Sequence, residues 1–476
     1  MTDGKESAQL SAGLAGVLEK TLGAGVTIEN LRALTGGASR TTWAFEAVTA
    51  GHRRALILRT GPPDDMHASM ELEARAQAAA AAAGAPVPRI LLADDSPATL
   101  GNPFLICNEI SGETIVRRIQ RRLDGADGPA VRSGLLSQCA QALAAIHRAD
   151  IGRVQDPSLN REDQLVEWRE RLDAMGDTTA TFEWVFRWLS ARRPPPAPAV
   201  LVHGDFRMGN LIVDGADLAA VLDWELVHVG EAYEDLAWFC IRAWRFGARA
   251  SLGAGGLGSS EDFLGAYQEA SGTSLDRRAF NWWLVLATLR WGIICRYQAE
   301  RHLSGQTRSV ELAAIGRRVC ETEWDLLDLL EGPPGDDAGR AAAREGAGQS
   351  DPAGAMTSDD SLNGRPTAAE LVAAAAEFLE TDVRGATSGQ VNFHARVAAN
   401  ALRIVERELL DAGESDARAA VAGLGFADEA GLAAAIRAGE LDGNDDPQSR
   451  EAEVTACLRA LVRHRLAVAH PGYDSR

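Results

Sequence analysis

The sequence predicts an α+β fold with two lobes, followed by a separate all-α region at the C-terminus. Short strands dominate residues 26–109, where apolar residues are β-branched or alternate with polar ones. Residues 112–330 are mostly helical in pattern. Residues 331–365 are rich in Gly, Ala, Asp, Ser and Pro and nearly empty of large apolar residues. Such a segment buries too little surface to offset its ordering entropy, so we expect a flexible linker there.

The first block, residues 1–330, is expected to form one domain with a cleft between its lobes. Its N-lobe should cover about residues 20–108 and its C-lobe about residues 112–330. Period-2 patterns predict the N-lobe strands, and an apolar, Ala-rich stretch predicts one helix among them. The strands are expected at 26–34, 42–48, 55–59, 89–93 and 104–109, and the helix at about 65–83.

The C-terminal block, residues 366–476, is typical of a small helical bundle. Thr367 and Glu370 form a capping-box pattern, in which each side chain satisfies a free backbone N–H group at the helix start. Further helices are expected at 393–410 and 454–468. An apolar stripe at helical spacing follows the cap and consists of Leu371, Ala374, Ala375, Phe378 and Leu379.

The composition limits the partners and the compartment. The formal net charge is −19 and the pI is about 5.0, which argues against nucleic acid and against an acidic membrane surface. Six cysteines are scattered without a CxxC pair, so neither a disulfide framework nor a zinc site is expected. The N-terminus lacks the apolar core of a signal peptide, and no 18-residue apolar run occurs. We therefore expect a cytoplasmic protein that does not enter a membrane.

The strongest functional signal lies between residues 202 and 224. Asp205 stands five residues before Asn210, and Asp223 follows thirteen residues later. Apolar segments flank the loop on both sides, as a preorganised site requires. One carboxylate can orient a hydroxyl, while an amide oxygen and the second carboxylate hold Mg²⁺. These groups are typical of phosphoryl transfer, in which positioning and charge neutralisation supply most of the catalysis.

With these residues the chain resembles the aminoglycoside phosphotransferase and choline-kinase-like group, which shares the protein-kinase fold. Within the group it resembles the branch that includes the kinase-like domains of acyl-CoA dehydrogenase family members 10 and 11. The resemblance covers roughly residues 20–330. The segment at 366–476 resembles a small uncharacterised bacterial domain found beside such phosphotransferases, which implies no chemistry.

The resemblance implies roles for the residues of the motif. Asp205 would be the catalytic base, and Asn210 and Asp223 would be the Mg²⁺ ligands. His203 would brace the loop. Asp235 matches an aspartate that tethers the catalytic loop in this group, and a helix-start cap is the plainer interpretation.

The nucleotide half of the site is less specific. Gly36, Gly37 and Ser39 fit a phosphate-covering turn, although a Gly-Gly turn on its own is more often a plain hairpin. The absence of GxxxxGK[ST] excludes a P-loop. Kinase folds usually place a lysine on the third strand, but this chain has lysine only at positions 5 and 20. Arg59 takes that position, with Glu73 as its expected partner.

Two further features complete the predicted site. Arg207, two residues after Asp205, is expected to neutralise charge at the transferred phosphate, with a surface cation as the alternative. Backbone groups of the hinge at Asn108, Glu109 and Ile110 are expected to bind an adenine edge.

The sequence therefore predicts an ATP- and Mg²⁺-dependent phosphotransferase whose acceptor is a hydroxyl of a small molecule. An acceptor pocket is expected between about 155 and 330, and seven of the tryptophans in this segment are the candidates for its lining, although most of them are expected to lie in the core. A hydroxyacyl-CoA-like substrate would suit an apolar pocket, and no dense acidic patch is present for a polycationic antibiotic. A nucleotide-binding pseudokinase or regulatory module is the first alternative, motivated by the missing lysine. An aminoglycoside-modifying kinase is the second. The tryptophans are Trp184, Trp188, Trp238, Trp244, Trp282, Trp283 and Trp291.

Overall fold

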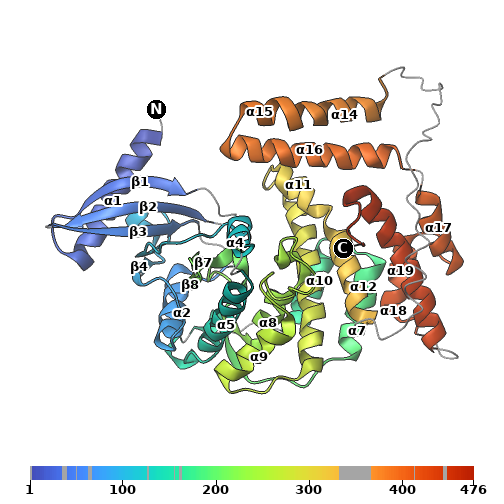
Figure 1. Ribbon diagram of the computed structural model, residues 1–476, viewed down its shortest axis with the longest axis horizontal. Coiled ribbons are helices and arrows are strands. Elements are labelled where there is room, and N and C mark those ends of the chain that lie inside the picture. Colours follow the sequence, from blue (N-terminus) through green and yellow to red (C-terminus); the bar gives the residue numbers. More distant parts are fainter. Residues whose placement is uncertain are drawn as a thin grey trace. The chain divides into compact units, whose positions relative to one another are not determined.

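The computed structural model describes most of the chain (Figure 1). The described residues are 3–34, 40–49, 51–62, 67–125, 128–154, 156–159, 163–331, 366–411, 413–442 and 447–475. The predicted linker lies outside them apart from Glu331, and so do Gly36, Gly37 and Ser39 of the predicted phosphate turn. The chain divides into two compact units, one of residues 1–162 and 194–284 and one of residues 163–193 and 285–476.

The first unit begins with the predicted N-lobe sheet. Its five strands pair antiparallel in the order β1-β2-β3-β5-β4. The sequence predicted strands at these positions, and the continuous burial along β5 shows that both faces of the sheet are covered there. The strands are β1 (Thr27–Leu34), β2 (Thr41–Thr49), β3 (His52–Thr60), β4 (Ile90–Asp94) and β5 (Phe104–Asn108).

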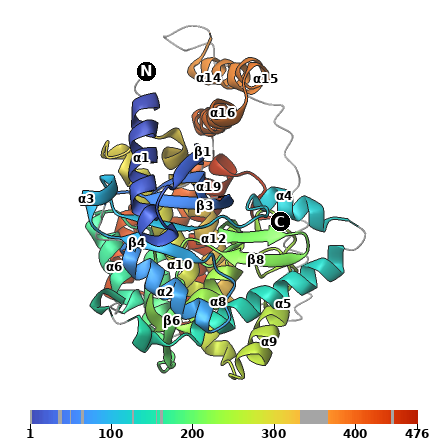
Figure 2. The ribbon, with the colours of Figure 1, turned by 90° about the vertical axis from the view of Figure 1, so that its left-hand side faces the viewer.

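A helix packs on each face of this sheet (Figure 2). α1 (Asp3–Leu22) covers the face that carries Leu56, Leu58 and Ile106. α2 (Met70–Ala82) covers the opposite face, which carries Ile57 and Leu105. The sequence predicted α2 but not α1. Since Arg59 follows Ile57 by two residues, it also lies on the α2 face.

The rest of the first unit holds the predicted catalytic motif. Two small antiparallel ladders surround it: β6 (Ala199–Val202) pairs with β9 (His228–Glu231), and β7 (Leu211–Asp214) pairs with β8 (Asp217–Val221). The polar turn at 214–217 joins β7 to β8 as predicted. The helices of this part are α3 (Pro97–Leu100), α4 (Val116–Leu123), α5 (Gly128–His147), α8 (Ala232–Cys240), α9 (Ser260–Ser271) and the short turns η1 (Ile151–Arg153), η2 (Pro157–Leu159), η3 (Met208–Asn210) and η4 (Arg242–Arg245).

The second unit is helical throughout its described residues. α10 (Arg277–Leu303) begins in the first unit and continues into this one. The other helices are α6 (Gln164–Ala174), α7 (Ala180–Ala191), α11 (Val310–Gly316), α12 (Val319–Glu331), α14 (Ala368–Phe378), the π-turn η5 (Leu379–Val383), α15 (Arg384–Ala386), α16 (Gly389–Leu409), α17 (Glu414–Gly423), α18 (Glu429–Ala438) and α19 (Pro447–Ala469).

The C-terminal helices share a core with helices that precede the predicted linker. Trp324 and Leu327 of α12 pack in one cluster with Val421 of α17, Leu432 of α18 and Leu458 of α19. The all-α C-terminal region predicted from the sequence is present, and its core also includes α12 and Ala180 of α7.

Buried ion pairs reinforce this shared core. Glu323 of α12 is fully buried and accepts two hydrogen bonds from Arg465 of α19, at 3.0 and 2.9 Å. Arg465 also contacts Glu429. Tyr473 donates its hydroxyl hydrogen to Asp325 at 2.8 Å. Because removing one partner of a buried pair leaves an uncompensated charge, these contacts make α12 and α19 interdependent.

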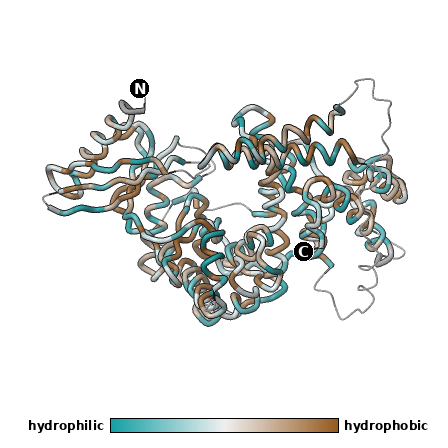
Figure 3. Tube along the Cα trace, turned by 45° about the horizontal axis from the view of Figure 1, so that its top comes forward, coloured by the Kyte–Doolittle hydropathy of each residue, from teal (hydrophilic) through white to brown (hydrophobic). Residues whose placement is uncertain are grey.

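The apolar stripe predicted on α14 is exposed instead of buried. The capping box forms as expected, with Thr367 and Glu370 bonding each other's backbone N–H groups at 2.7 and 3.3 Å. However, Leu371 and Phe378 are each 57% exposed, because α14 packs on α16 through its opposite face, where Ala376 is buried. Apolar residues are spread along both helices (Figure 3), so periodicity alone did not identify the buried face.

No helix within the described ranges is long and apolar enough to cross a lipid bilayer.

Candidate active site

The predicted catalytic loop connects β6 to β7 and is held by backbone contacts. Gly204 has a φ of +85°, and a Cβ atom there would lie 2.4 Å from the carbonyl oxygen of Leu226. Only glycine fits this position, so the glycine of the His-Gly-Asp motif has a steric reason. The N–H of Leu222 donates to the carbonyl oxygen of Asn210 at 2.8 Å. This bond brings the end of β8, and hence Asp223, next to the loop.

Asp235 of α8 tethers the loop by its backbone. Its Oδ2 accepts the N–H of His203 at 2.7 Å, and its Oδ1 accepts the N–H of Gly204 at 2.9 Å. His147 at the end of α5 contacts Oδ2 through Nε2 at 3.2 Å, and the other ring nitrogen of His147 contacts the hydroxyl of Tyr267 at 2.8 Å. Burial raises the pKa of Asp235, but these hydrogen bonds and the nearby histidines outweigh it and lower the pKa below the usual value. Asp235 is therefore a buried, ionised anchor.

His203 braces the loop through both ring nitrogens. Nδ1 accepts the N–H of Asp205 at 3.2 Å, so Nε2 carries the hydrogen that bonds the carbonyl oxygen of Leu222 at 3.0 Å. The ring is fully buried against Trp224. Burial lowers the pKa of His203, although the carboxylates around it oppose the shift. The neutral imidazole thus acts as a strut between the two ends of the motif.

The Asp205 carboxylate meets three nitrogen donors. Trp238 of α8 donates its indole N–H to Oδ1 at 2.8 Å. Asn210 donates from Nδ2 to Oδ2 at 2.7 Å, and also to the backbone oxygen of Asp205 at 3.0 Å. Arg207 contacts both carboxylate oxygens through Nε at 3.1 Å. The carboxylate is therefore fixed in one orientation.

Arg207 lies beside Asp205 on an aromatic surface. Its guanidinium carbon is 4.9 Å from the ring centroid of Trp244, which makes a cation–π contact. A Cβ atom at position 209 would lie 2.4 Å from NH1 of Arg207, so Gly209 leaves the space that this side chain fills. The side chain is 27% exposed. It can therefore change partners when an anion arrives.

Asn210 and Asp223 provide oxygens suited to a hard cation. The amide nitrogen of Asn210 is committed to Asp205, so its oxygen takes no part in those bonds. Asp223 has a φ of +66°, a left-handed conformation that is uncommon outside glycine and costs about 1 kcal/mol or more. A carboxylate and an amide oxygen are ligands that Mg²⁺ accepts, with water and phosphate oxygens completing its shell. The residues present therefore fit the predicted metal.

Arg59 forms ion pairs with a carboxylate from each of the two lobes. NH1 bonds Glu73 of α2 at 3.0 Å, which is the contact expected in place of the usual lysine pair. NH2 bonds Oδ1 of Asp223 at 2.6 Å. Burial disfavours the charged guanidinium, but attraction to these carboxylates raises the pKa of Arg59 overall. Arg59 stays cationic beside the predicted metal ligand.

A second arginine supports this pair. NH1 of Arg40 lies 2.7 Å from Oε1 of Glu73, and Nε lies 3.6 Å from Glu225. NH2 of Arg40 donates to the carbonyl oxygen of Ala68 at 2.7 Å, just before α2. Glu73 is fully buried, and burial raises its pKa to about 7 although Arg59 and Arg40 oppose the shift. Glu225 also pairs with Arg59, at 3.8 Å.

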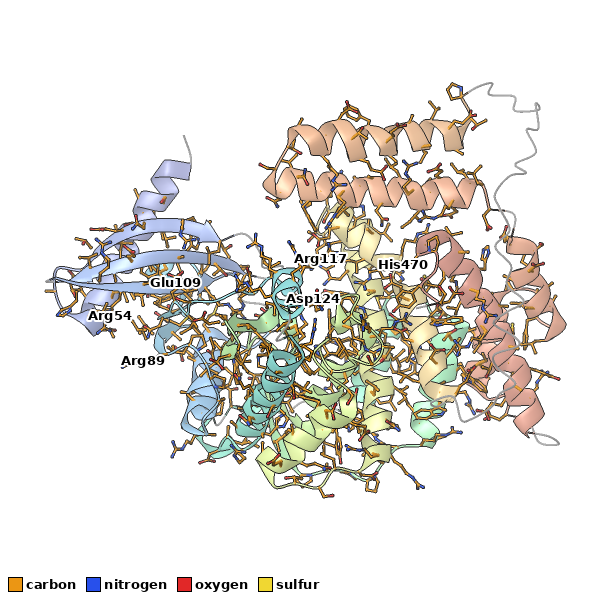
Figure 4. All side chains as sticks on the ribbon, in the orientation of Figure 1. Arg54, Arg89, Glu109, Arg117, Asp124 and His470 are labelled. Carbon is orange, nitrogen blue, oxygen red and sulfur yellow. The ribbon has the colours of Figure 1, made fainter. Side chains whose placement is uncertain are left out.

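Two backbone N–H groups of the predicted hinge are already bonded within the first unit. The N–H of Asn108 bonds the carbonyl oxygen of Arg89, and the N–H of Glu109 bonds that of Ala55, each at 3.0 Å. Figure 4 marks Glu109 beside the sheet. An adenine edge would therefore have to meet the carbonyl groups of Asn108 and Glu109, or the N–H of Ile110.

Two residues of this constellation, Arg40 and His147, carried no assigned role in the sequence, and Trp238 was named only as a candidate for the acceptor pocket. The three residues reach the site from segments far apart in the chain. Trp238 stands three residues after Asp235, so the two side chains lie on one face of α8. Arg40 follows the Gly36-Gly37 pair in the sequence. His147 gave no local signal, because its partner lies 88 residues away.

The fold and these groups together define a kinase-like phosphotransferase. A β-rich lobe contributes an ion-paired cation, and a mostly helical lobe contributes a His-Gly-Asp loop with two candidate metal ligands. A sequence model of the phosphotransferase enzyme family matches residues 30–281, more than half of the chain, and the chain therefore belongs to this family. A second model, a domain of unknown function (DUF6285), matches residues 385–473.

Curated relatives lie among the kinase-like acyl-CoA dehydrogenase proteins. The chain is 27% identical over 299 residues to acyl-CoA dehydrogenase family member 10 of Mus musculus, covering 57% of this chain and 27% of that protein. It is 28% identical over 268 residues to acyl-CoA dehydrogenase family member 11 of Gallus gallus, covering 52% and 34%. The chain thus spans about a third or less of the length of these relatives.

A solved structure shares the fold. It comes from Ralstonia eutropha, is described as a candidate aminoglycoside phosphotransferase, and matches with a TM-score of 0.54 at 21% identity. The match covers 66% of this chain and 95% of that one. The likeness bears out the predicted two-lobed, protein-kinase-like fold.

Proposed function

We propose that this protein is an ATP- and Mg²⁺-dependent kinase of a small-molecule hydroxyl group. The observation that carries the proposal is the Asp205–Asn210 contact at 2.7 Å, with Asp223 bound to Arg59 at 2.6 Å. A carboxylate base, two metal-ligand oxygens and a buried cation thus occur together in a chain of the phosphotransferase family.

In this proposal Asn210 and Asp223 would hold Mg²⁺, which would supply positive charge to the phosphates. Arg59 contributes a fixed positive charge to the phosphates, and Glu73 holds it in place. The turn that includes Gly36, Gly37 and Ser39 would cover the phosphates, although it lies outside the described residues. Backbone groups of the hinge receive the adenine.

The chemical step needs a positioned hydroxyl. Asp205 accepts a hydrogen bond from the acceptor hydroxyl and takes its proton as the oxygen bonds to the γ-phosphorus. The bond between that phosphorus and the β,γ-bridging oxygen breaks, and the electron pair leaves with ADP. Arg207 neutralises charge on the transferred group, which its position two residues from Asp205 allows. The products are ADP, the phosphorylated acceptor and a proton.

Aromatic side chains favour an acceptor with an apolar portion. Trp238 and Trp244 form an edge-to-face pair with ring centroids 5.3 Å apart, next to Asp205. The ring of Phe246 lies next to that of Trp244, with the two ring centroids 6.2 Å apart. Phe246 is 36% exposed and has a left-handed φ of +51°. A bulky residue in that conformation is strained, and such strain concentrates at functional sites. This surface supports a hydroxyacyl-like acceptor, consistent with the acyl-CoA dehydrogenase relatives.

The test is phosphate transfer from radiolabelled ATP to a panel of hydroxyacyl-CoA, choline-like, sugar and aminoglycoside acceptors. We expect wild-type protein to label an apolar hydroxyl compound, and Asp205→Ala to lose at least ~100-fold of kcat while retaining ATP affinity. Asp214→Ala, at the exposed β7–β8 turn, is the matched control and should keep full activity.

Two outcomes would contradict the proposal. Full turnover by Asp205→Ala would remove the assigned base. Binding of ATP and Mg²⁺ by wild-type protein without transfer to any acceptor would favour a nucleotide-binding pseudokinase.

A further inference from the structure

Helix α8 contacts the catalytic loop at two levels. Asp235 holds the loop backbone through the N–H groups of His203 and Gly204. Trp238 lies three residues later on the same helix face and holds the Asp205 side chain through its indole N–H at 2.8 Å. One rigid helix thereby fixes both the backbone position of Asp205 and the direction of its carboxylate.

The three donors to Asp205 differ in what else they must do. Asn210 is the proposed metal ligand, and Arg207 is the proposed partner of the transferred phosphoryl group. Trp238 is assigned to neither the metal nor the phosphoryl group, although its ring belongs to the proposed acceptor surface; it is only 3% exposed and carries a neutral donor that cannot ionise. Among the three, it is therefore the donor best placed to stay on Asp205 throughout the reaction.

The indole itself is held by its neighbours. Its ring meets Trp244 edge to face, and Trp244 carries the guanidinium of Arg207, which returns to Asp205. Asp205, Trp238, Trp244 and Arg207 thus close a ring of contacts. These contacts restrict rotation of the indole away from the carboxylate, and the edge-to-face pair with Trp244 does not depend on the Arg207–Asp205 contact.

The Asp205 carboxylate has a limited number of positions that can accept hydrogen bonds. Each carboxylate oxygen can accept about two hydrogen bonds. Trp238 occupies one position on Oδ1, Asn210 occupies one on Oδ2, and Nε of Arg207 contacts both oxygens. The position that Arg207 yields is the one an acceptor hydroxyl can take.

We propose that Trp238 is a positioning residue, which keeps Asp205 aligned while Arg207 leaves the carboxylate for an anionic oxygen and the acceptor hydroxyl replaces it. This inference rests on the proposed kinase function. It predicts that loss of the indole N–H lowers kcat but leaves nucleotide binding intact, because that N–H bonds the proposed base.

The kinetic test uses Trp238→Phe, which keeps an aromatic ring against Trp244 and removes the N–H. We expect kcat to fall about 10- to 100-fold, the range for one hydrogen bond to a charged group, with the ATP KM within about twofold of wild type. Trp168→Phe is the matched control, since Trp168 is also buried, its indole N–H donates to Gln164 at 3.2 Å, and it has no role in the proposed site. It should keep wild-type kcat.

A double-variant cycle separates positioning from general packing. In an Asp205→Asn background, Trp238→Phe should have little further effect on the residual rate, because the carboxylate that it aligns is gone. Multiplicative losses in the double variant would overturn the proposal. A fall in ATP affinity equal to the fall in kcat would do the same.

Indole ¹⁵N–¹H spectra test the contact without relying on turnover. The Trp238 signal, assigned by its loss in Trp238→Phe, should move strongly in Asp205→Asn and hardly at all in Asp214→Asn. An unmoved signal overturns the inference even if the enzyme is active. A shifted signal in a protein that transfers no phosphate refutes the kinase function and with it the catalytic role of Trp238. Should Trp238→Phe fail to fold, Trp238→His, which retains a ring N–H, should recover more activity than Trp238→Leu.

Discussion

Replacing Asp235 by asparagine should displace the catalytic loop and weaken the fold together. Asp235 is fully buried, and its two oxygens accept three hydrogen bonds, from His203, Gly204 and His147. Asparagine turns one of those oxygens into an NH₂ donor. At least one backbone N–H then faces another donor instead of an acceptor, and the remaining bonds lose the help of the negative charge.

The expected magnitude follows from this count. An unpaired buried N–H costs about 1–3 kcal/mol, and hydrogen bonds to a charged group are each stronger by about 1 kcal/mol than neutral ones. Asp235→Asn should therefore lower the free energy of unfolding by ~3 kcal/mol. For a unit of roughly 250 residues this corresponds to a drop in Tm of about 6–12 °C. A loop shift of about 1 Å would also lower kcat by ~100-fold.

The assay pairs urea unfolding with phosphate transfer. Asp124→Asn provides the control, because Asp124 is 66% exposed and pairs with Arg132 at the surface (Figure 4), where such changes stay within about 0.5 kcal/mol. If Asp235→Asn unfolds within 0.5 kcal/mol of wild type and keeps its kcat, the tether argued from the three bonds is refuted.

Two further predictions concern pH and the shared helical core. Burial lowers the pKa of His203 in the folded protein. Below about pH 6.5 the unfolded chain therefore binds a proton at this residue that the folded protein does not bind. The free energy of unfolding should fall as the pH drops from 7.5 to 5.5. In His203→Gln this loss of stability between pH 7.5 and pH 5.5 should be smaller by about 1 kcal/mol, as measured by urea unfolding at the two pH values. An equal loss in the variant and the wild type would contradict a buried neutral ring at position 203. Arg465→Met should destabilise the chain by about 3–5 kcal/mol, because Glu323 would be buried without its partner. Arg465→Met with Glu323→Met should regain most of that loss in thermal unfolding, whereas equal loss in the single and double variants would show that the charge pair is not responsible.

The strands and the catalytic motif could be predicted because the patterns that indicate them lie within short stretches of the sequence. Short apolar runs at β3 and β5 indicated strands, and the Asp205–Asn210 spacing indicated a loop, which a direct side-chain bond closes in the fold. The capping box of Thr367 was equally local. α1 was not predicted, although its pattern is also local. Its apolar residues Leu10, Leu14, Val17 and Leu18 share one face, but the segment is also rich in Ala and Gly.

Other features needed the folded chain. The contacts of Arg40 and Trp238 depend on partners that are distant in the sequence. Arg40 bonds Ala68, 28 residues away, and Trp238 bonds Asp205, 33 residues away. The buried face of α14 could not be read, because both of its faces are apolar and only packing on α16 decides between them. Likewise, the shared core of α12 and α19 depends on contacts across more than 100 residues.

The exchange of lysine for arginine at position 59 is consistent with the charge of its surroundings. A lysine offers one nitrogen, whereas Arg59 reaches Glu73 with NH1 and Asp223 with NH2 at the same time. With Arg40 and Glu225 included, two arginines face three carboxylates, which leaves one negative charge when Glu73 is ionised and none when it is protonated. On the proposed roles, a divalent cation at Asp223 makes either balance positive, and that is the sign a polyphosphate requires.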